Sequence, residues 1–145
     1  MDTREPVLVW GQRGSSDGEF LIPYSIAIGE DSVVYIADSG NHRIQCFRLS
    51  DGTFLRSIEV LANFPPGLLP VCVNYLGTER IYVTDYYNHR VQVFDPKTGK
   101  FVHAWGKRGS EAGEFLHPLV CTVNTRDGSI HVLDWGPSTH SIFYP

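Results

Sequence analysis

Two short segments of the chain carry carboxylate, amide, imidazole and guanidinium groups at the same spacing. The first contains Asp38, Asn41, His42 and Arg43, and the second, 47 residues later, contains Asp85, Asn88, His89 and Arg90. No Ser-His-Asp triad and no carboxylate pair stands outside this repeat. An aspartate or asparagine in a tight turn bonds nearby backbone amides, and an arginine pairs with a buried carboxylate. We therefore interpret the repeated Asp, Asn and Arg as structural, and the two histidines as candidate binding residues.

A third, altered copy of the motif begins at Asp134. The segment Asp134-Trp-Gly-Pro-Ser-Thr-His140 lacks the asparagine and the arginine, and by its letters it carries two extra residues. Aromatic residues break the pattern here, because Tyr86 and Tyr87 replace Ser-Gly of the first copy and Trp135 lies in the same region. Exposed aromatics on loops are typical of protein-binding surfaces and also stack on unpaired RNA bases. These three aromatics are candidate contact residues.

A second repeated signature precedes the first copy of the motif and returns between its second and third copies. Trp10-Gly-Gln-Arg13-Gly14, followed by Gly18-Glu-Phe20, returns 95 residues later as Trp105-Gly-Lys-Arg108-Gly109 with Gly113-Glu-Phe115. We expect the glycines to serve backbone geometry rather than phosphate binding, because no helix follows them. Arg13 and Arg108 join the candidate contact residues.

Metal-ligand and cysteine spacing argue against a metal or redox site. His117, next to Pro118, is the only histidine close to the start of an expected inner strand, whereas catalytic zinc usually has three protein ligands. The cysteines at 46, 72 and 121 lie in apolar runs without a Cys-x-x-Cys pair, so we expect buried free thiols. We predict no catalytic residue, no metal and no cofactor.

Short strands must position these groups. Runs rich in β-branched and aromatic residues, bounded by Gly, Asp and Asn, predict four strands per period. They fall at residues 25–28, 33–36, 43–47 and 53–58; at 71–73, 81–84, 90–94 and 101–105; and at 120–123, 130–133 and 141–144. With the strands of a period called a, b, c and d, residues 7–10 match the end of strand d. The order is therefore d-abcd-abcd-abc.

A fixed period near 47 residues built from four strands predicts an all-β protein of the β-propeller type. The expected blades are about 23–58, about 70–106, and about 118–145 plus residues 7–10. Three blades leave an unpaired strand edge and two uncovered apolar flanks. We therefore expect a six-bladed ring made by a strand-exchanged homodimer, in which the d strand of each chain completes the last blade of its partner. The rival interpretation is that the 145 residues are half of a longer chain.

The motif Asp38-x-x-Asn-His-Arg-Ile-Gln and its copy at Asp85 resemble the NHL repeat family, and the Gly-x-Arg-Gly lead-in belongs to the same pattern. This resemblance covers nearly the whole chain and implies a propeller, typically with six blades. It does not choose a function, because the family includes protein-binding and RNA-binding regulators, with peptide-amidating lyases as relatives.

By strand parity, the b–c and d–a loops lie on one face of the propeller. We predict a non-catalytic scaffold that binds a protein or peptide there, with single-stranded RNA binding and a metal-dependent lyase activity as alternatives. The net charge of −4 and the pI near 5.8 argue mildly against nucleic acid. No apolar run is long enough to cross a bilayer and the N-terminus does not read as a signal peptide, so we expect no membrane partner and a cytoplasmic location.

Overall fold

The computed structural model describes residues 5–29, 31–60, 73–76, 80–124, 126–136 and 138–144, with 73–76 described by backbone alone. The protein is all-β and its strands form three larger sheets and one small one. The matches to known propellers reported below support this architecture. No helix within the described residues is long and apolar enough to cross a membrane.

The first sheet has four antiparallel strands in chain order: β3 (Pro23–Ile28), β4 (Val33–Asp38), β5 (Arg43–Arg48) and β6 (Phe54–Glu59). The second sheet repeats this order with β7 (Val73–Leu76), β8 (Arg80–Asp85), β9 (Arg90–Phe94) and β10 (Phe101–Trp105). The third sheet has three described strands: β11 (Pro118–Val123), β12 (Ile130–Asp134) and β13 (Thr139–Phe143). The strands follow the predicted order within each sheet, with bounds that shift by up to three residues.

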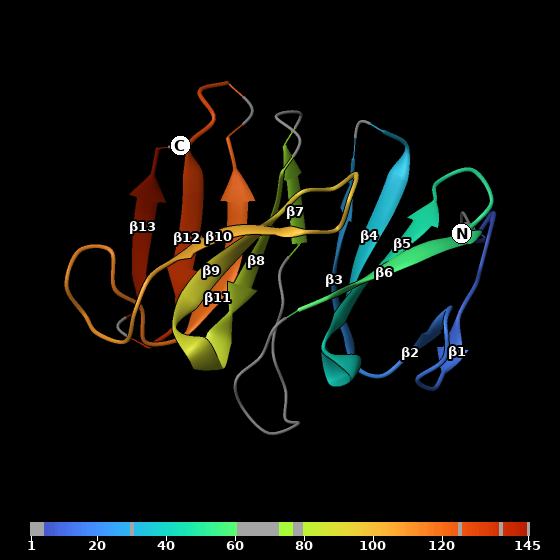
Figure 1. Ribbon diagram of the computed structural model, residues 1–145, viewed down its shortest axis with the longest axis horizontal. Helices are drawn as coiled ribbons and strands as arrows, with labels where there is room; N and C mark the ends of the chain where they lie inside the picture. The colour runs from blue at the N-terminus through green and yellow to red at the C-terminus, as the bar shows by residue number, and fades with distance from the viewer. Residues whose placement is uncertain are drawn as a thin grey trace.

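Two strand predictions need comment. Of the strand expected at 71–73, only residue 73 lies within the described residues, and there β7 begins; Pro70 and Cys72 lie outside them. Residues 5–10 form no strand in the single chain. The strand expected at 7–10 was expected to pair with a second copy, so it stays a prediction. A strand needs a hydrogen-bonding neighbour, and Figure 1 shows the N-terminus and β13 at opposite ends of the long axis.

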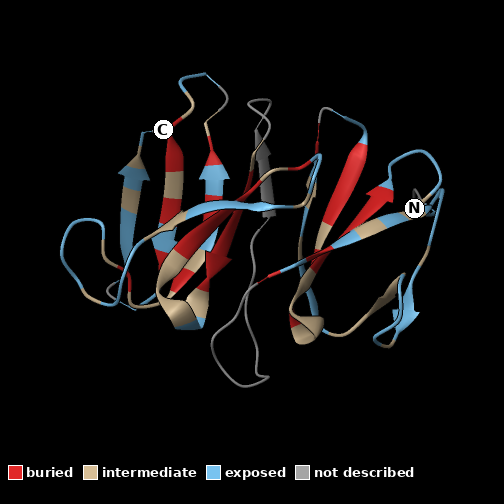
Figure 2. Cartoon of the chain, in the orientation of Figure 1, coloured by how far each residue is buried: buried red, intermediate tan, exposed pale blue. Residues whose placement is uncertain are grey.

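The core lies between neighbouring sheets rather than inside one sheet. One face of β4, β5 and β6 packs against one face of β8 and β9. The opposite face of β8 and β9 packs against β11 and β12, with Phe115 from the preceding connection fully buried between them. Figure 2 shows the buried residues gathered on the middle strands, whereas most of β13 is exposed. Middle strands covered on both faces explain the nearly continuous apolar run in β4.

We call the packed interface between two neighbouring sheets a seam. The cysteines in the two seams are buried, as predicted. Cys46 and Cys121 are free and buried, one in each seam. Burial raises the pKa of the Cys46 thiol to about 11, and it also raises the pKa of Tyr35, whose hydroxyl donates to Asp31. Both groups are therefore protonated and structural at neutral pH.

Connections between strands gather at one edge of the sheets. The b–c turns are short 3₁₀ helices, η1 (Ser39–Asn41) and η2 (Tyr86–Asn88). The connection before β3 forms the small parallel sheet of β1 (Gln12–Arg13) and β2 (Glu19–Phe20). Figure 1 places η1, η2 and this small sheet along the lower edge of the molecule, so the predicted loop face exists.

The burial of Phe115 gives a test of the seam between the second and third sheets. Phe115→Ala should lower the free energy of unfolding by about 3–5 kcal/mol, because it removes a ring that neighbours on both sides enclose. Phe101→Ala is the matched control, since that ring is 46% exposed and should cost clearly less. Equal losses in urea denaturation would mean that the seam is not a packed core.

Candidate functional site

The Asp38 carboxylate is the centre of a buried hydrogen-bond cluster next to η1. Its Oδ1 accepts from the backbone N–H of Leu21 at 2.7 Å. Its Oδ2 accepts from Asn41 Nδ2 at 2.8 Å, from Arg43 Nε at 2.9 Å and from Gln45 Nε2 at 3.0 Å. A buried carboxylate is stable only with such partners, so the turn and strand β5 are locked to one another.

The same donors also hold the connection that precedes β3. Arg43 Nη2 donates to the carbonyl oxygens of Ser16 at 2.7 Å and Glu19 at 2.9 Å. Gln45 Nε2 donates to the Glu19 carbonyl at 2.6 Å, and its Oε1 accepts from the Gly18 N–H at 2.9 Å. Sequence reasoning missed this glutamine, although it recurs at the same offset from each of the first two aspartates. Because these donors are engaged within the protein, they position the loop rather than a ligand.

The second and third copies vary this arrangement. Asp85 accepts from Asn88 Nδ2 at 2.7 Å and from Arg90 Nε and Gln92 Nε2, both at 2.8 Å. Asp134 instead accepts from backbone N–H groups, those of Leu116 at 2.7 Å, His117 at 2.6 Å and Gly136 at 3.1 Å. Backbone amides thus replace the side-chain donors that the third copy lacks.

The two-residue insertion expected in the third copy is wrong. The strand register pairs Asp134 with Thr139, as it pairs Asp38 with Arg43 and Asp85 with Arg90. Ser138 has φ 56°, the left-handed value that His42 and His89 adopt in the earlier turns. The error arose because His140 was aligned with those histidines, whereas it lies within β13.

Neither turn histidine is a fully exposed side chain. His42 and His89 are each half-buried and adopt φ values of 53° and 56°, an uncommon conformation for a residue other than glycine. The Nδ1 atom of His89 lies 2.5 Å from the carbonyl oxygen of Leu116. This histidine therefore ties η2 to the connection before β11.

Four rings meet where η2 approaches the third sheet. The ring of Tyr86 lies 4.8 Å from that of Tyr87, 4.6 Å from that of His117 and 6.5 Å from that of Trp135, measured between centroids. Tyr87 is 41% exposed and Trp135 is 66% exposed. The three aromatics that break the repeat thus lie together, and His117 joins them. We call Tyr86, Tyr87, His117 and Trp135 the aromatic cluster.

The electrostatics of this edge are mixed. Burial is the main cause that raises the pKa of Tyr86, and the neighbouring ionisable groups, Asp134 among them, raise it further, so its hydroxyl stays protonated at neutral pH. Arg13 and Arg108 are exposed, and within the described residues neither forms a salt bridge. Figure 1 shows β1, which carries Arg13, beside the first sheet, so the structure does not bring that arginine into the aromatic cluster.

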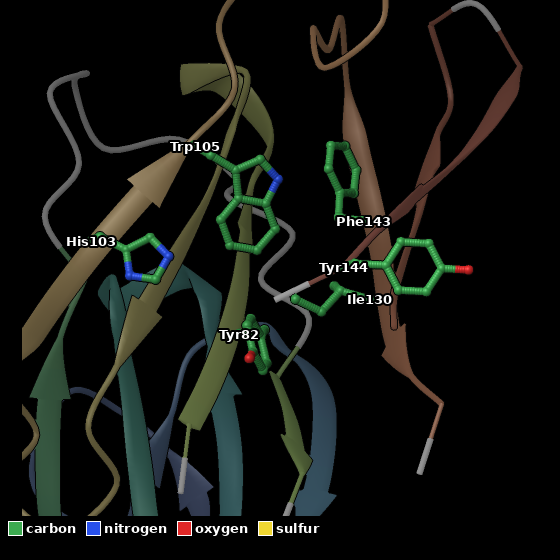
Figure 3. A pocket seen from close by; sticks show the side chains of 6 residues that line it. All are labelled: Tyr82, His103, Trp105, Ile130, Phe143 and Tyr144. Carbon is green, nitrogen blue, oxygen red and sulfur yellow. The ribbon is translucent and has the colours of Figure 1, made fainter. Parts of the chain in front are cut away.

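A cavity of about 380 Å³ opens between the second and third sheets. Its lining is mostly apolar: Tyr82, His103, Trp105, Ile130, Phe143 and Tyr144. Figure 3 shows Trp105 and His103 on β10 facing Phe143 and Tyr144 at the end of the chain. Sequence reasoning did not identify this cavity. One histidine among aromatic rings can bind an apolar group, but it forms no nucleophile or acid–base pair.

Metal-ligating residues do not gather in the part of the chain that the structure describes, where no three His, Cys, Asp or Glu residues are close enough to hold an ion. His131 Nδ1 and His140 Nε2 lie 3.0 Å apart on the third sheet. The Nε2 atom of that His131 lies 2.9 Å from Ser129 Oγ.

Comparisons with protein families match two parts of this chain. The family described as NHL repeat matches residues 20–47, and the family described as 6-bladed beta-propeller matches residues 70–139. The first match contains the Asp38 cluster and the second contains the Asp85 cluster and the aromatic cluster.

Curated relatives are similar over segments. The chain is 40% identical over 50 residues to protein lin-41 of Caenorhabditis elegans, which is 34% of this chain and 4% of that protein. It is 35% identical over 69 residues to the E3 ubiquitin-protein ligase TRIM32 of Mus musculus, covering 48% and 10%. It is 35% identical over 81 residues to peptidyl-glycine alpha-amidating monooxygenase B of Xenopus laevis, covering 47% and 9%. The chain thus spans a tenth or less of these relatives.

Solved structures share the fold. Hydrazine synthase of Kuenenia stuttgartiensis aligns with a TM-score of 0.57 at 16% identity, covering 85% of this chain and 36% of that one. Virginiamycin B lyase of Staphylococcus aureus aligns with a TM-score of 0.59 at 15% identity, covering 84% and 41%. Identities this low carry the fold alone.

The buried aspartate cluster can be tested against an exposed ion pair of the same length. Asp38 Oδ2 and Arg43 Nε lie 2.9 Å apart with the carboxylate fully buried, and Asp51 Oδ2 and Arg48 Nη1 also lie 2.9 Å apart, with both side chains about half exposed. Asp38→Ala should lower the free energy of unfolding by about 3–5 kcal/mol, because it leaves buried hydrogen-bond donors without an acceptor. Asp51→Ala should change stability little. Comparable melting temperatures for the two variants would show that the buried cluster does not hold the fold.

Proposed function

We propose, from the premise that this chain belongs to the NHL-repeat family of β-propellers, that it is a non-catalytic interaction module that binds a protein or peptide. The binding edge is the one formed by η1, η2 and the connections before β3 and β11. The observation that carries the proposal is the aromatic cluster, because its rings occupy positions that the repeat does not require to be aromatic.

The geometry of the aromatic cluster suits a peptide side chain or a flat backbone segment. Tyr86 is held against Tyr87 and His117, so its ring is already ordered before a ligand arrives. Tyr87 and Trp135 then present exposed rings of large area. Tyrosine and tryptophan lose few rotamers on binding and are enriched among residues that dominate interface energies. The surrounding loops are fixed by the aspartate clusters, so the platform is rigid.

The two candidate arginines lie at different places along this edge. Arg108 lies in the connection before β11 and is exposed, whereas Arg13 lies by the first sheet. We propose that a ligand centred on the aromatic cluster reaches Arg108, and that Arg13 serves only a ligand long enough to cross the edge. His42 and His89 contribute through the loops they hold.

Two other functions follow from specific observations. Exposed rings beside arginines would also stack the bases of single-stranded RNA. The similarity to the amidating monooxygenase over 81 residues favours a metal-dependent lyase as a further alternative. A stoichiometric transition metal in the purified protein would support the lyase, and RNA retention that weakens steeply with salt would support the nucleic-acid reading.

The test pans a random library of phage-displayed 12-residue peptides against the immobilised protein. Peptides that bind the wild-type protein should bind Tyr87→Ser/Trp135→Ser at least tenfold more weakly, while the melting temperature of that variant stays nearly unchanged. Leu49→Ser is the control, because that side chain is 43% exposed but lies at the end of β5, outside the aromatic cluster. It should bind the peptides like the wild type.

Three results would contradict the proposal. The first is a library that yields no binders, and the second is a double variant that binds the selected peptides undiminished. The third is a labelled 12-nucleotide oligouridine that binds through Tyr87 and Trp135 while peptides do not. A large fall in melting temperature for the double variant would place both rings in the core instead.

A further inference from the structure

The two outer flanks of the molecule expose side-chain positions that are buried at the inner seams. On the third sheet, Leu133 is 47% exposed and Ile142 is 50% exposed. In the first sheet the same positions, counted from the repeated aspartate, are Ala37 and Cys46, and both are fully buried against the second sheet. The outer flank of the third sheet therefore carries apolar side chains at the positions that a neighbouring sheet covers in the first sheet.

The outer flank of the first sheet shows the complementary pattern. Ile26 and Ile28 of β3 are 61% and 57% exposed. The strand register makes them equivalent to Cys121 and Val123 of β11, which are 1% and 9% exposed because the second sheet covers them. The outer flank of the first sheet is thus equivalent to the face with which the third sheet packs on the second sheet. The outer flank of the third sheet is equivalent to the face with which the first sheet packs on the second sheet.

The N-terminal segment already lies where the last strand of a preceding sheet belongs. The ring centroids of Trp10 and Phe47 are 6.0 Å apart, and those of Trp105 and Phe143 are 5.7 Å apart. Both phenylalanines follow the repeated aspartate by nine residues. Residues 7–10 therefore rest on the first sheet as the end of β10 rests on the third.

The residues after each tryptophan agree with this equivalence. Gly11 and Gly106 have φ values of 90° and 102°, and a Cβ atom on either would clash with Phe20 or Phe115 respectively. Phe20 lies 5.6 Å from Phe47, as Phe115 lies 5.7 Å from Phe143. The whole segment from Trp10 to Phe20 thus has the conformation of an inter-sheet connection. Yet residues 7–10 have no strand beside them within the described residues.

The third sheet lacks the strand that this segment could supply. Phe47 is covered by Phe54 of β6 at 5.8 Å, and Phe94 is covered by Phe101 of β10 at 5.9 Å, both edge to face. The equivalent Phe143 has no outer strand beside it, since β13 pairs only with β12 among the described strands. The cavity lined by Trp105 and Phe143 opens at this place, so we assign it to an unsealed edge rather than to a small ligand.

We propose that residues 7–10 of one chain form the fourth strand of the third sheet of a second copy, and that the outer flank of the third sheet packs on the first sheet of that copy. Two such seams, related by a two-fold axis, close six sheets into a ring. The free edge of β13 and the apolar flanks are then both covered. The argument for this interface uses no contact with the proposed ligand, so the two proposals can fail independently.

A register for the new strand pair follows from the second sheet. There, Trp105 pairs with Val91, Ala104 with Gln92 and His103 with Val93. Transfer to the equivalent positions pairs Trp10 with the partner's β13 at position 140, Val9 at position 141 and Leu8 at position 142. The His131 and His140 rings on this flank stack 5.1 Å apart, so both nitrogens of His131 and the Nε2 atom of His140 have partners when the flank is covered.

A cysteine cross-link tests this register directly. Directly opposed residues in antiparallel strands have Cα atoms about 4.5–5.5 Å apart, within the range of a disulfide. The Val9→Cys/Ser141→Cys variant should therefore form a covalent dimer under mild oxidation, seen on a non-reducing gel. Val9→Cys/Thr122→Cys is the matched control, because β11 lies three strands away from the new strand, about 14 Å. The single variants control for the natural cysteines.

Solution mass provides the second readout. Each chain has a mass of 16.3 kDa, and the wild-type protein should scatter light as a particle of twice that mass. Leu133→Asp should convert it to monomer, because a charge is tolerated on the exposed flank but not in a seam. Val102→Asp, 42% exposed on the outer strand β10, should remain dimeric. Deleting residues 1–10 should likewise abolish the dimer or cause aggregation.

The proposal is overturned by a wild-type particle of 16.3 kDa, by a dimer that Leu133→Asp leaves intact, or by equal cross-linking of the control pair. The first result would be expected if other residues of a longer chain cover these flanks.

Discussion

Each large sheet in this molecule has two apolar faces, and this constraint governs the rest of the structure. Sequestering both faces requires a neighbour on each side, which the second sheet has and the first and third sheets have only once. Ile26, Ile28, Leu133 and Ile142 follow this rule, because they are about half exposed where the equivalent inner positions are buried. Phe47, on the outer flank of the first sheet, stays buried beside the rings of Trp10, Phe20 and Phe54. Apolar flanks of this size are rare on isolated soluble proteins and mark interaction surfaces.

A second constraint fixes the loop edge. The buried aspartates 38, 85 and 134 each accept hydrogen bonds from the following turn. Those at 38 and 134 also accept from the preceding connection, so that in these two copies the turn, the middle strands and the lead-in loop form one unit. Glu19 and Glu114 reinforce the lead-in loops, because bonds from backbone N–H groups lower the pKa of each carboxyl. Residues of the turns that these clusters do not use are free to differ, and Tyr86, Tyr87 and Trp135 are such residues. Rigid loops with variable side chains suit a binding platform.

Much of the fold could be predicted from the sequence, because equivalent segments of the repeat show the same strand pattern and a strand predicted in one copy can be compared with the others. The bounds of β9 and β10 were predicted without error for this reason. The third turn was misread, since matching letters around His140 outweighed the strand register that only the structure supplies. The role of Gln45 was missed, because its partners Gly18 and Glu19 lie 27 and 26 residues away. The meeting of His117 with the three aromatics also depends on a contact between sheets, which periodicity does not encode. The strand expected at 7–10 needs a hydrogen-bonding neighbour, and it stays a prediction because the expected neighbour belongs to a second copy.

Hydrogen–deuterium exchange followed by mass spectrometry tests the central claim, that neighbouring sheets must cover every flank, most directly. If a second copy seals the ring, the amides of residues 7–10 and of β13 should exchange as slowly as those of β9 and β10, whose strands are paired within the chain. If residues 7–10 and β13 exchange at the rate of an open edge while β9 and β10 stay protected, the flanks are uncovered in solution and the account is wrong.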